Sequence, residues 1–592
     1  MTVEKLITDH IDIWSSALQT RSTAGRGSNG KIDLYGIKKL RELILELAVR
    51  GKLVPQNAND EPASELLKRI AAEKAELVKQ GKIKKQKPLP EISNDEKPFE
   101  LPEGWEWVRF GDISEIERGG SPRPIKDYLT TEKDGLNWIK IGDTDIGGKY
   151  ISSANEKIKP SGLHKTRMVY PGDFLLTNSM SFGRPYITLI EGCIHDGWLR
   201  ISPPSLLDKN FLYQLLSSPF IIKAFKEKAS GAVVLNLNAD KVRETFILIP
   251  PFDEQQRIVK KANELMILCD QLEQQSLTSL DAHQQLVEAL LATLTDSQNA
   301  KELSENWSRI SQHFDTLFTT EASIDTLKQT ILQLAVMGKL VPHDPNDEPA
   351  SELLKRIGQK KALMVKTGKI KKQKPLPPIS DEEKPFELPQ GWEWCRIGEI
   401  IANMDAGWSP ACLPEPSPNE NIWGVLKTTA VQNLEYREQE NKTLPSSKQP
   451  RPQYEVQNGD ILVTRAGPKN RVGISCLVEK TRSKLMISDK IIRFHLVSNA
   501  ISAKYISLCL NCGVTADYLE ASKSGMAESQ MNISQDNLKL SPVALPPTAA
   551  QLKMISTIEN FSKVCDTLKS RLQSAQQTQL HLADALTDAA LS

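Results

Sequence analysis

The sequence predicts an α+β fold in which two mixed α/β domains are separated by antiparallel, coiled-coil-like helical regions and related by a pseudo-twofold internal repeat. Three observations predict it. The 592-residue chain contains one long segment twice, and short strand-like runs follow each copy. A helix with a heptad-type apolar stripe then closes each copy.

The repeat is most easily seen in one string. AVRGKLVPQNANDEPASELLKRI at 48–70 returns as AVMGKLVPHDPNDEPASELLKRI at 335–357, an offset of 287 residues. GKIKKQKPLP, EKPFELP and GWEW recur at the same offset, whereas ILIPP at 247 matches VALPP at 543 with an offset of 296. The second copy is therefore nine residues longer between these points.

The two copies have diverged unevenly. Residues 40–113 are nearly copied in 327–400, whereas 114–235 and 401–531 share a skeleton but few side chains. A pair of catalytic domains would more plausibly keep its site and let the frame drift. The pattern therefore favours one repeated frame that carries two different binding surfaces.

Local patterns predict the elements in order. LRELILELAVRGKL has apolar residues at helical spacing and stops at Gly51, and a second helix begins near Pro62 and ends at Gly81. A linker rich in proline and charge follows. Beyond it the strand-like runs are WEWVRFGDI, LNWIKIGDT, DFLLTNS, PYITLIEG and WLRISP.

The helix that closes each copy has an apolar seam with alternating steps of four and three. In the first copy the seam is Ile258, Ala262, Leu265, Cys269 and Leu272, and in the second it is Met554, Ile558, Phe561, Cys565 and Leu568. Two matched stripes favour a short helix-on-helix spacer over a helix packed only on its own domain.

These features divide the chain into five predicted segments. They are an N-terminal helical region and linker (1–98), a first mixed domain (99–253), a central helical region and linker (254–386), a second mixed domain (387–548) and a C-terminal helical region (549–592).

Composition excludes a membrane-spanning or strongly basic protein. The chain is 39% hydrophobic and 25% charged, and no apolar run approaches the length of a bilayer span. The N-terminus carries acids inside its apolar pattern, unlike a secretory signal, so we expect a cytoplasmic protein. The net charge of +1 still allows a local basic groove.

No catalytic or metal-binding motif stands out. The sequence lacks HExxH, GxxxxGK[ST], GxSxG and a GxGxxG after a strand. IPPF at 249–252 resembles the NPPF loop of adenine-N6 methyltransferases, but Ile249 replaces the asparagine that holds the target amino group, so we interpret Pro-Pro as a turn. Cys509 and Cys512 form the one close cysteine pair, and a zinc site needs four ligands. We expect buried thiols and no catalytic residue, metal or cofactor in this chain.

Basic and polar side chains in probable loops of the divergent middles are candidates for DNA binding, because arginine pairs with guanine edges, asparagine with adenine, and serine or lysine with phosphate. They are Arg118, Ser121, Arg123, Lys140, Asn178, Arg184 and Asn236 in the first middle, and Lys427, Arg465, Lys469, Asn470, Arg471, Lys523 and Asn532 in the second. Each one alone is equally well explained as a solvated loop residue. The same holds for the linker lysines Lys82, Lys84, Lys85, Lys87, Lys369, Lys371, Lys372 and Lys374, which are candidate phosphate contacts.

With these features in place, the sequence resembles the specificity subunit of type I restriction-modification systems over essentially its whole length. GKLVP, NDEPASELLKRI, the FELPxGWEW entry and the Pro-Pro-then-Gln exit into a long helix are similar to that family's frame. The long repeat is most similar to the A-type relatives grouped as family IB. The resemblance implies that 99–253 and 387–548 are target-recognition domains, each reading half of a split double-stranded DNA site, while the helices set the gap.

The resemblance also implies partners and their cofactors. Two methyltransferase subunits would dock on the repeated frame and methylate adenine, and restriction subunits with motor and nuclease activity would join them. S-adenosylmethionine would belong to the methyltransferases, and ATP with magnesium to the motors. The family architecture places the N-terminal helices (1–80) beside the C-terminal helix (549–592), mirroring the central block (254–367).

Two alternatives remain open. One is a stand-alone DNA adenine methyltransferase or nuclease, for which the IPPF loop is the only support and no donor-binding loop is found. The other is a protein-binding scaffold without a role on DNA.

Overall fold

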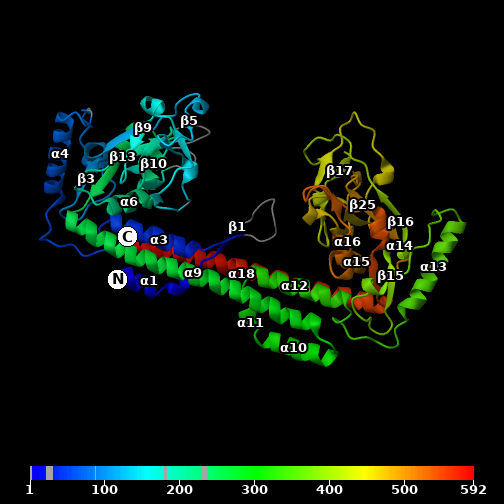
Figure 1. Ribbon diagram of the computed structural model, residues 1–592. Helices are drawn as coiled ribbons and strands as arrows, with labels where there is room; N and C mark the ends of the chain where they lie inside the picture. Colours follow the sequence, from blue (N-terminus) through cyan, green and yellow to red (C-terminus); the bar gives the residue numbers. More distant parts are fainter. Residues whose placement is uncertain are drawn as a thin grey trace. The chain divides into compact units, whose positions relative to one another are not determined.

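The computed structural model describes residues 3–21, 31–83, 85–86, 88–145, 147–178, 183–229 and 236–591. Within them the chain forms two compact units, the first reaching residue 278 and resuming at 576, the second covering 279–575. Each unit holds one sheet-rich domain and parts of the long helices α9 (Phe252–Asp296) and α18 (Thr548–Leu591) (Figure 1). The predicted α+β class is confirmed.

In the first unit, α3 (Tyr35–Val49) buries a continuous apolar face that includes Ile37, Leu40 and Ile44. Gly51 follows the helix with φ +66°, where a Cβ would lie 2.4 Å from the Pro102 ring. Gly338 repeats this conformation with φ +72° after α12 (Glu321–Val336). Only glycine fits such a stop, which explains GKLVP in both copies.

The first sheet-rich domain has a strand in each of the five predicted runs and adds further short strands. β3 (Glu106–Arg109) pairs with β14 (Phe246–Ile249). One sheet has the order β4 (Glu115–Arg118), β13 (Trp198–Ser202), β10 (Phe174–Thr177), β11 (Pro185–Thr188) and β7 (Tyr150–Ile151). A second has the order β5 (Leu129–Thr130), β8 (Glu156–Ile158), β6 (Leu136–Ile139), β12 (Gly192–Ile194) and β9 (Arg167–Val169). Helices α6 (Lys209–Ser217) and α7 (Pro219–Lys228) follow.

The second sheet-rich domain repeats the frame and much of the sheet order of the first. β15 (Glu393–Arg396) pairs with β28 (Pro542–Leu545) as β3 does with β14. The main sheet has the order β16 (Ile401–Ala406), β25 (Ile491–Leu496), β21 (Ile461–Thr464) and β23 (Ser475–Leu477). Smaller sheets have the orders β20 (Asn441–Thr443), β17 (Gly424–Leu426), β24 (Leu485–Met486), and β22 (Ala466–Gly467), β27 (Met531–Asn532), β26 (Ser524–Gly525).

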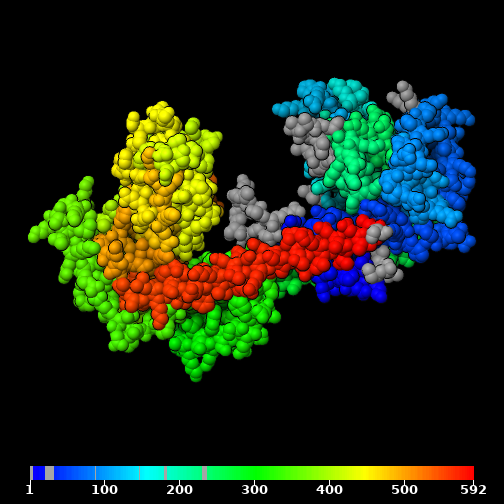
Figure 2. All heavy atoms as spheres, turned by 180° about the vertical axis from the view of Figure 1, so that it is seen from behind, coloured from blue at the N-terminus to red at the C-terminus, as the bar shows by residue number. Residues whose placement is uncertain are grey.

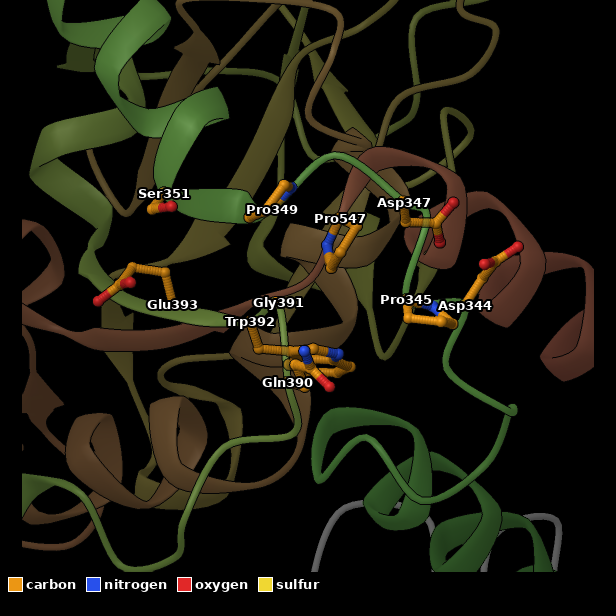
Figure 3. Close-up of a pocket in the computed structure, with 10 residues that line it drawn as sticks. All are labelled: Asp344, Pro345, Asp347, Pro349, Ser351, Gln390, Gly391, Trp392, Glu393 and Pro547. Carbon is orange, nitrogen blue, oxygen red and sulfur yellow. The ribbon is translucent and has the colours of Figure 1, made fainter.

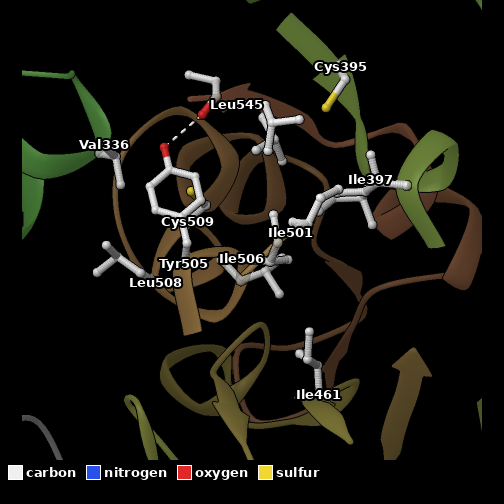
Figure 4. Packing of buried hydrophobic residues seen from close by; sticks show 14 of the residues in the cluster. Val336, Cys395, Ile397, Ile461, Ile501, Tyr505, Ile506, Leu508, Cys509 and Leu545 are labelled. Carbon is white, nitrogen blue, oxygen red and sulfur yellow. Dashed lines mark hydrogen bonds between the residues drawn. The ribbon is translucent and has the colours of Figure 1, made fainter. Parts of the chain in front are cut away.

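Helix α15 (Ala503–Asn511) passes through the core of this domain. Tyr505 is fully buried there, and its hydroxyl donates to the Ala544 carbonyl at 2.7 Å (Figure 4). Cys395 and Cys509 pack in the same cluster, and burial raises the pKa of the Cys509 thiol to about 12. Cys509 and Cys512 therefore sit in an apolar core, as expected for structural thiols.

Helices α4 (Ala63–Lys79) and α13 (Ala350–Lys366) are each held to their domain by a lysine at the equivalent position of the repeat. Lys74 Nζ donates to the Gly111 carbonyl at 2.7 Å, and Lys361 Nζ donates to the Gly398 carbonyl at 2.5 Å. Burial lowers the pKa of both ammonium groups. The near-identity of this part of the sequence thus extends to its contacts.

The predicted Pro-Pro turn is also repeated. Helices α9 and α18 begin just after this turn. A buried glutamine in the first turn of each helix donates a hydrogen bond back to the carbonyl of the first proline. Gln255 Nε2 donates to the Pro250 carbonyl at 3.0 Å, and Gln551 Nε2 donates to the Pro546 carbonyl at 2.9 Å. IPPF is therefore a helix entry, as interpreted from the sequence.

The long helices carry the pseudo-twofold repeat in their contacts. Arg41 pairs with Asp270 at 2.6 Å, and their equivalents Lys328 and Asp566 pair at 3.2 Å. The seam positions Ile258, Ala262, Leu265 and Cys269 on α9 are buried, as are Met554, Ile558 and Cys565 on α18. These contacts confirm the internal repeat in the helices.

The predicted pairing of the N-terminal helices with the C-terminal helix is confirmed within the first unit. Tyr35 Oη donates to Asp584 Oδ1 at 2.7 Å, and Lys39 Nζ lies 3.2 Å from the same carboxylate. Lys52 Nζ donates to the Leu591 carbonyl at 2.8 Å. Figure 2 shows this end of α18, in red, beside the blue N-terminal helices.

We predict that a circular permutant opened near residue 300, with the original ends joined by a short glycine-serine linker, folds and unfolds cooperatively. The opening falls between α9 and α10 (Ala300–Gln312), and both original ends belong to the first unit. Circular dichroism and a thermal melt measure the result. A permutant opened between Leu175 and Leu176, inside a central strand, is the matched control that should not fold. Loss of the cooperative melt in the first permutant would contradict the cyclic arrangement.

Candidate nucleic-acid interface

Four of the candidates in the first domain converge on one turn, between β12 and β13. Asp196 Oδ1 accepts from the Ser121 hydroxyl at 2.7 Å, and Asp196 Oδ2 lies 3.5 Å from Arg123 Nη2. The Asp196 carbonyl accepts from Asn178 Nδ2 at 2.7 Å and from Arg118 Nε at 3.3 Å. Residues far apart in the sequence thus form one polar cluster.

Strand register explains the convergence. Arg118 at the end of β4 is opposite Leu199 on β13, and Thr177 at the end of β10 is opposite Trp198. The ends of β4 and β10 therefore lie on either side of the turn that carries Asp196. The hydrogen bond from Ser121 is the largest cause of the lowered pKa of the Asp196 carboxyl, with Arg123 contributing.

The cluster borders a surface hollow lined by Ser121, Arg123, Trp138, Lys140, His195 and Asp196. Lys140 Nζ pairs with Glu156 at 2.7 Å, and the Arg123 side chain is 80% exposed. Burial lowers the pKa of His195, whose Nδ1 accepts from the Gly197 amide at 2.6 Å. The hollow therefore offers one exposed cation, Arg123, and a half-buried, paired Lys140 beside an imidazole and an indole.

The remaining candidates of the first domain differ in exposure. Asn178 is 1% exposed and its amide is committed to the Asp196 carbonyl, so its role in this structure is to position the turn. Arg184 and Asn236 are exposed. Parts of the candidate loops around them, residues 179–182 and 230–235, lie outside the described residues.

In the second domain, two distant candidate loops form one surface. The small sheet of β22, β27 and β26 joins residues 463–473 to 521–532. The Ile533 amide donates to the Arg465 carbonyl at 2.9 Å, and the Lys469 amide donates to the Glu528 carbonyl at 2.7 Å. The surface brings together Arg465, Lys469, Asn470 and Asn532, of which all but the half-buried Arg465 are exposed.

Three basic candidates in this domain are engaged by other groups of the same domain. Arg471 donates to Gln432 Oε1 at 2.9 Å and to the Val431 carbonyl at 2.8 Å, and burial lowers the pKa of its guanidinium. The Lys523 side chain is 6% exposed, and its Nζ donates to the Lys469 carbonyl at 2.8 Å. Lys427 pairs with Glu440 at 3.3 Å. These side chains shape the surface, whereas the exposed Lys469, Asn470 and Asn532 face solvent, with Lys469 Nζ 3.8 Å from Glu528 Oε1.

Sequence reasoning missed two features of these surfaces. Asp196, the centre of the first cluster, lies in CIHDGW, where Asp-Gly is a turn signal but gives no sign of its partners. Met526 is fully exposed at the tip of the hairpin between β26 and β27. An exposed apolar side chain beside a polar surface is visible only once the hairpin is known.

The linker lysines are at the surface, at Lys82, Lys85, Lys369, Lys371, Lys372 and Lys374, while Lys84 and Lys87 lie outside the described residues. Across the part of the chain that the structure describes, no three histidine, cysteine or acidic side chains converge as a metal site requires. None of the helices described is both long and apolar enough to cross a membrane.

The family described as "Type I restriction modification DNA specificity domain" matches residues 102–282 and 389–576, one match for each copy of the repeat. The chain belongs to this family. The specificity subunit is 69% identical to the type I restriction enzyme EcoEI specificity subunit of Escherichia coli, over the whole of both chains. It is 47% identical, again over both whole chains, to the EcoAI specificity subunit of the same species.

Two solved structures also resemble the subunit. The HsdS subunit from Thermoanaerobacter tengcongensis is 18% identical, with a TM-score of 0.37, and the match covers 84% of this chain and 98% of that one. A chain from a structure of type I restriction-modification complex assembly and conformational transition is 18% identical, with a TM-score of 0.44, and the match covers 83% and 99% of the two chains.

Basic residues that are bonded within the second domain should affect its stability, whereas those on the candidate surface should affect DNA binding. We predict that Arg471→Ala lowers the free energy of unfolding by about 2 kcal/mol, because it leaves buried carbonyl groups unpaired. Arg465→Ala, the matched control, should change it by less than about 0.5 kcal/mol and yet weaken DNA binding by the assembled complex. Chemical denaturation and a DNA titration measure the two effects. Equal destabilisation by both substitutions would contradict this division.

Proposed function

We propose that this DNA specificity subunit reads a bipartite site on double-stranded DNA, with the first recognition domain on one half and the second on the other. One observation carries the proposal: most frame contacts examined in the first copy recur in the second, whereas the surfaces on the two domains are built from different residues. A repeated frame suits two identical partners, and unlike surfaces suit two unlike half-sites. Such pseudo-symmetry matches half-sites spaced along the helix.

The cations, hydroxyl and amides on the two surfaces supply the chemistry of recognition. Arg118, Ser121, Arg123 and Lys140 would face DNA from the first domain, and Arg465, Lys469, Asn470 and Asn532 from the second. Arginine and asparagine can read base edges, while lysine and serine bind phosphates. Binding of this kind weakens as salt rises, because phosphate contacts release counterions.

The bond-making steps belong to partner subunits in this proposal. Two methyltransferase subunits dock on the repeated frame and methylate an adenine in each half-site, using S-adenosylmethionine. Restriction subunits that use ATP and magnesium complete the complex in the cytoplasm. Helices α9 and α18 set the gap between the half-sites.

A stand-alone methyltransferase or nuclease is the alternative. The one sequence feature that supports it is IPPF. This segment is the turn that leads into α9, held by the hydrogen bond from Gln255, and it has isoleucine where a target-binding asparagine is needed. Methyl transfer to DNA by the purified chain alone would favour the alternative.

We predict that replacing residues 114–235 with the corresponding segment of another specificity subunit changes one half of the recognised site and spares the other. The replaced segment carries the Asp196 cluster, whereas the second domain and the frame stay as they are. Selection from a pool of randomised duplexes by the assembled complex reads both halves. An exchange that alters both halves, or neither, would overturn the assignment of one half-site to each domain.

A further inference from the structure

The internal repeat allows one site of the frame to be compared in two versions. At this corner, Trp105 of the first copy or Trp392 of the second lies against the first turn of α9 or α18. In the first copy this corner is closed by the chain's own side chains. Trp105 Nε1 donates to Glu254 Oε2 at 2.9 Å, and Gln56 Nε2 donates to Glu254 Oε1 at 2.8 Å. Arg257 holds Asp60 with two hydrogen bonds, at 2.5 and 3.2 Å.

The second copy keeps one side of this network and lacks the other. Trp392 and Asp347 are the equivalents of Trp105 and Asp60, but Glu254 and Arg257 are replaced by Ala550 and Lys553, and Gln56 by His343. Trp392 is 6% exposed, and its Nε1 is buried with no hydrogen-bond partner among the described residues. An unmade hydrogen bond at a buried donor costs free energy, so a ligand that accepts it is favoured.

A pocket opens at this corner. Its lining includes Asp344, Asp347, Pro349, Gln390, Trp392 and Pro547 (Figure 3). Asp344 and Asp347 lie on the same side of the pocket in this view. Neither carboxylate forms an ion pair with a lysine or arginine of the described chain, whereas Asp60 does so with Arg257. Asp344 Oδ1 already accepts from the Asn346 backbone and side-chain amides at 2.9 and 3.0 Å, so the pocket presents Asp347 as the acceptor for a cation, together with one buried donor.

We infer that this pocket receives an arginine of a docked methyltransferase subunit, with its guanidinium on Asp347 and a neighbouring backbone carbonyl on Trp392 Nε1. The first copy indicates the ligand chemistry. There the Arg257 guanidinium donates to the Asp60 carboxylate, and a Glu254 carboxylate oxygen accepts from Trp105 Nε1. Arginine suits such a site because its planar fork binds a carboxylate with two hydrogen bonds. The inference rests on the proposed docking of two identical partners.

The consequence is that the two docking positions are unequal although the frame is repeated. At the first position the chain fills the corner itself, so the partner gains no hydrogen bonds there. At the second position the partner completes the network. Two copies of one partner are then bound with different affinities, and the second position is filled first.

The test uses a matched pair of substitutions in the full chain, titrated with its methyltransferase subunit by calorimetry. We expect Asp347→Asn to weaken the tighter of the two binding steps about tenfold, while Asp60→Asn leaves both steps unchanged because that carboxylate already serves Arg257. A third variant, Ala550→Glu with Lys553→Arg and His343→Gln, rebuilds the closed corner. It should raise the melting temperature of the free chain and weaken the same step.

Unchanged binding by Asp347→Asn would overturn the inference, as would equal weakening by Asp347→Asn and Asp60→Asn. Two equal binding steps in the wild-type chain would overturn it as well. A wild-type chain that binds no methyltransferase subunit, or only one, would overturn the proposed function itself. The two failures are therefore distinguishable within one set of titrations.

Discussion

Each long helix ends against a lysine from GKLVP, and much of the architecture depends on this contact. Lys52 Nζ donates to the Leu591 carbonyl at 2.8 Å, and its equivalent Lys339 donates to the Thr295 carbonyl at 2.6 Å and the Ser297 carbonyl at 2.9 Å. The last carbonyl groups of a helix lack partners within it, and a cation there is also favoured by the helix dipole. Because the lysine that follows one helix caps the end of another, α3 is fixed to α18 and α12 is fixed to α9.

This arrangement separates what must be kept from what may vary. The frame residues make the same contacts in both copies, from the buried lysines Lys74 and Lys361 to the glutamines Gln255 and Gln551. The domains between them share the strand pair that opens and closes each one, β3 with β14 and β15 with β28, and an antiparallel sheet order, β4-β13-β10-β11 and β16-β25-β21-β23. Loop surfaces can therefore diverge without disturbing the helices. The corner at Trp105 and Trp392 is the exception, since there the frame itself differs between the copies.

Much of the fold could be predicted from the sequence, because periodicity and repetition report directly on backbone structure. The seams of α9 and α18, the glycine stops, the strands and the Pro-Pro entries all follow from local pattern. The roles of individual polar side chains do not. Arg465 and Arg471 have similar neighbours in VTRAGPKNRVG, so the sequence does not distinguish them. In the structure, Arg471 is partly buried because it donates hydrogen bonds to the Val431 carbonyl and to Gln432, which lie on another strand. Asn178 and Lys523 likewise donate to backbone carbonyls that are distant in the sequence. Asp196, the centre of the first cluster, could be recognised only once the strand register was known. The five segment boundaries and the contacts with DNA stay predictions.

We propose that one frame carries two unlike readers, each serving a methyltransferase subunit. Mapping methylated adenines across the genome of a cell that carries this chain with its partners tests it most directly. The account predicts a motif in two parts of different sequence, separated by a gap of fixed length, with one methylated adenine in each part. A single uninterrupted motif, or two parts with a variable gap, would contradict it.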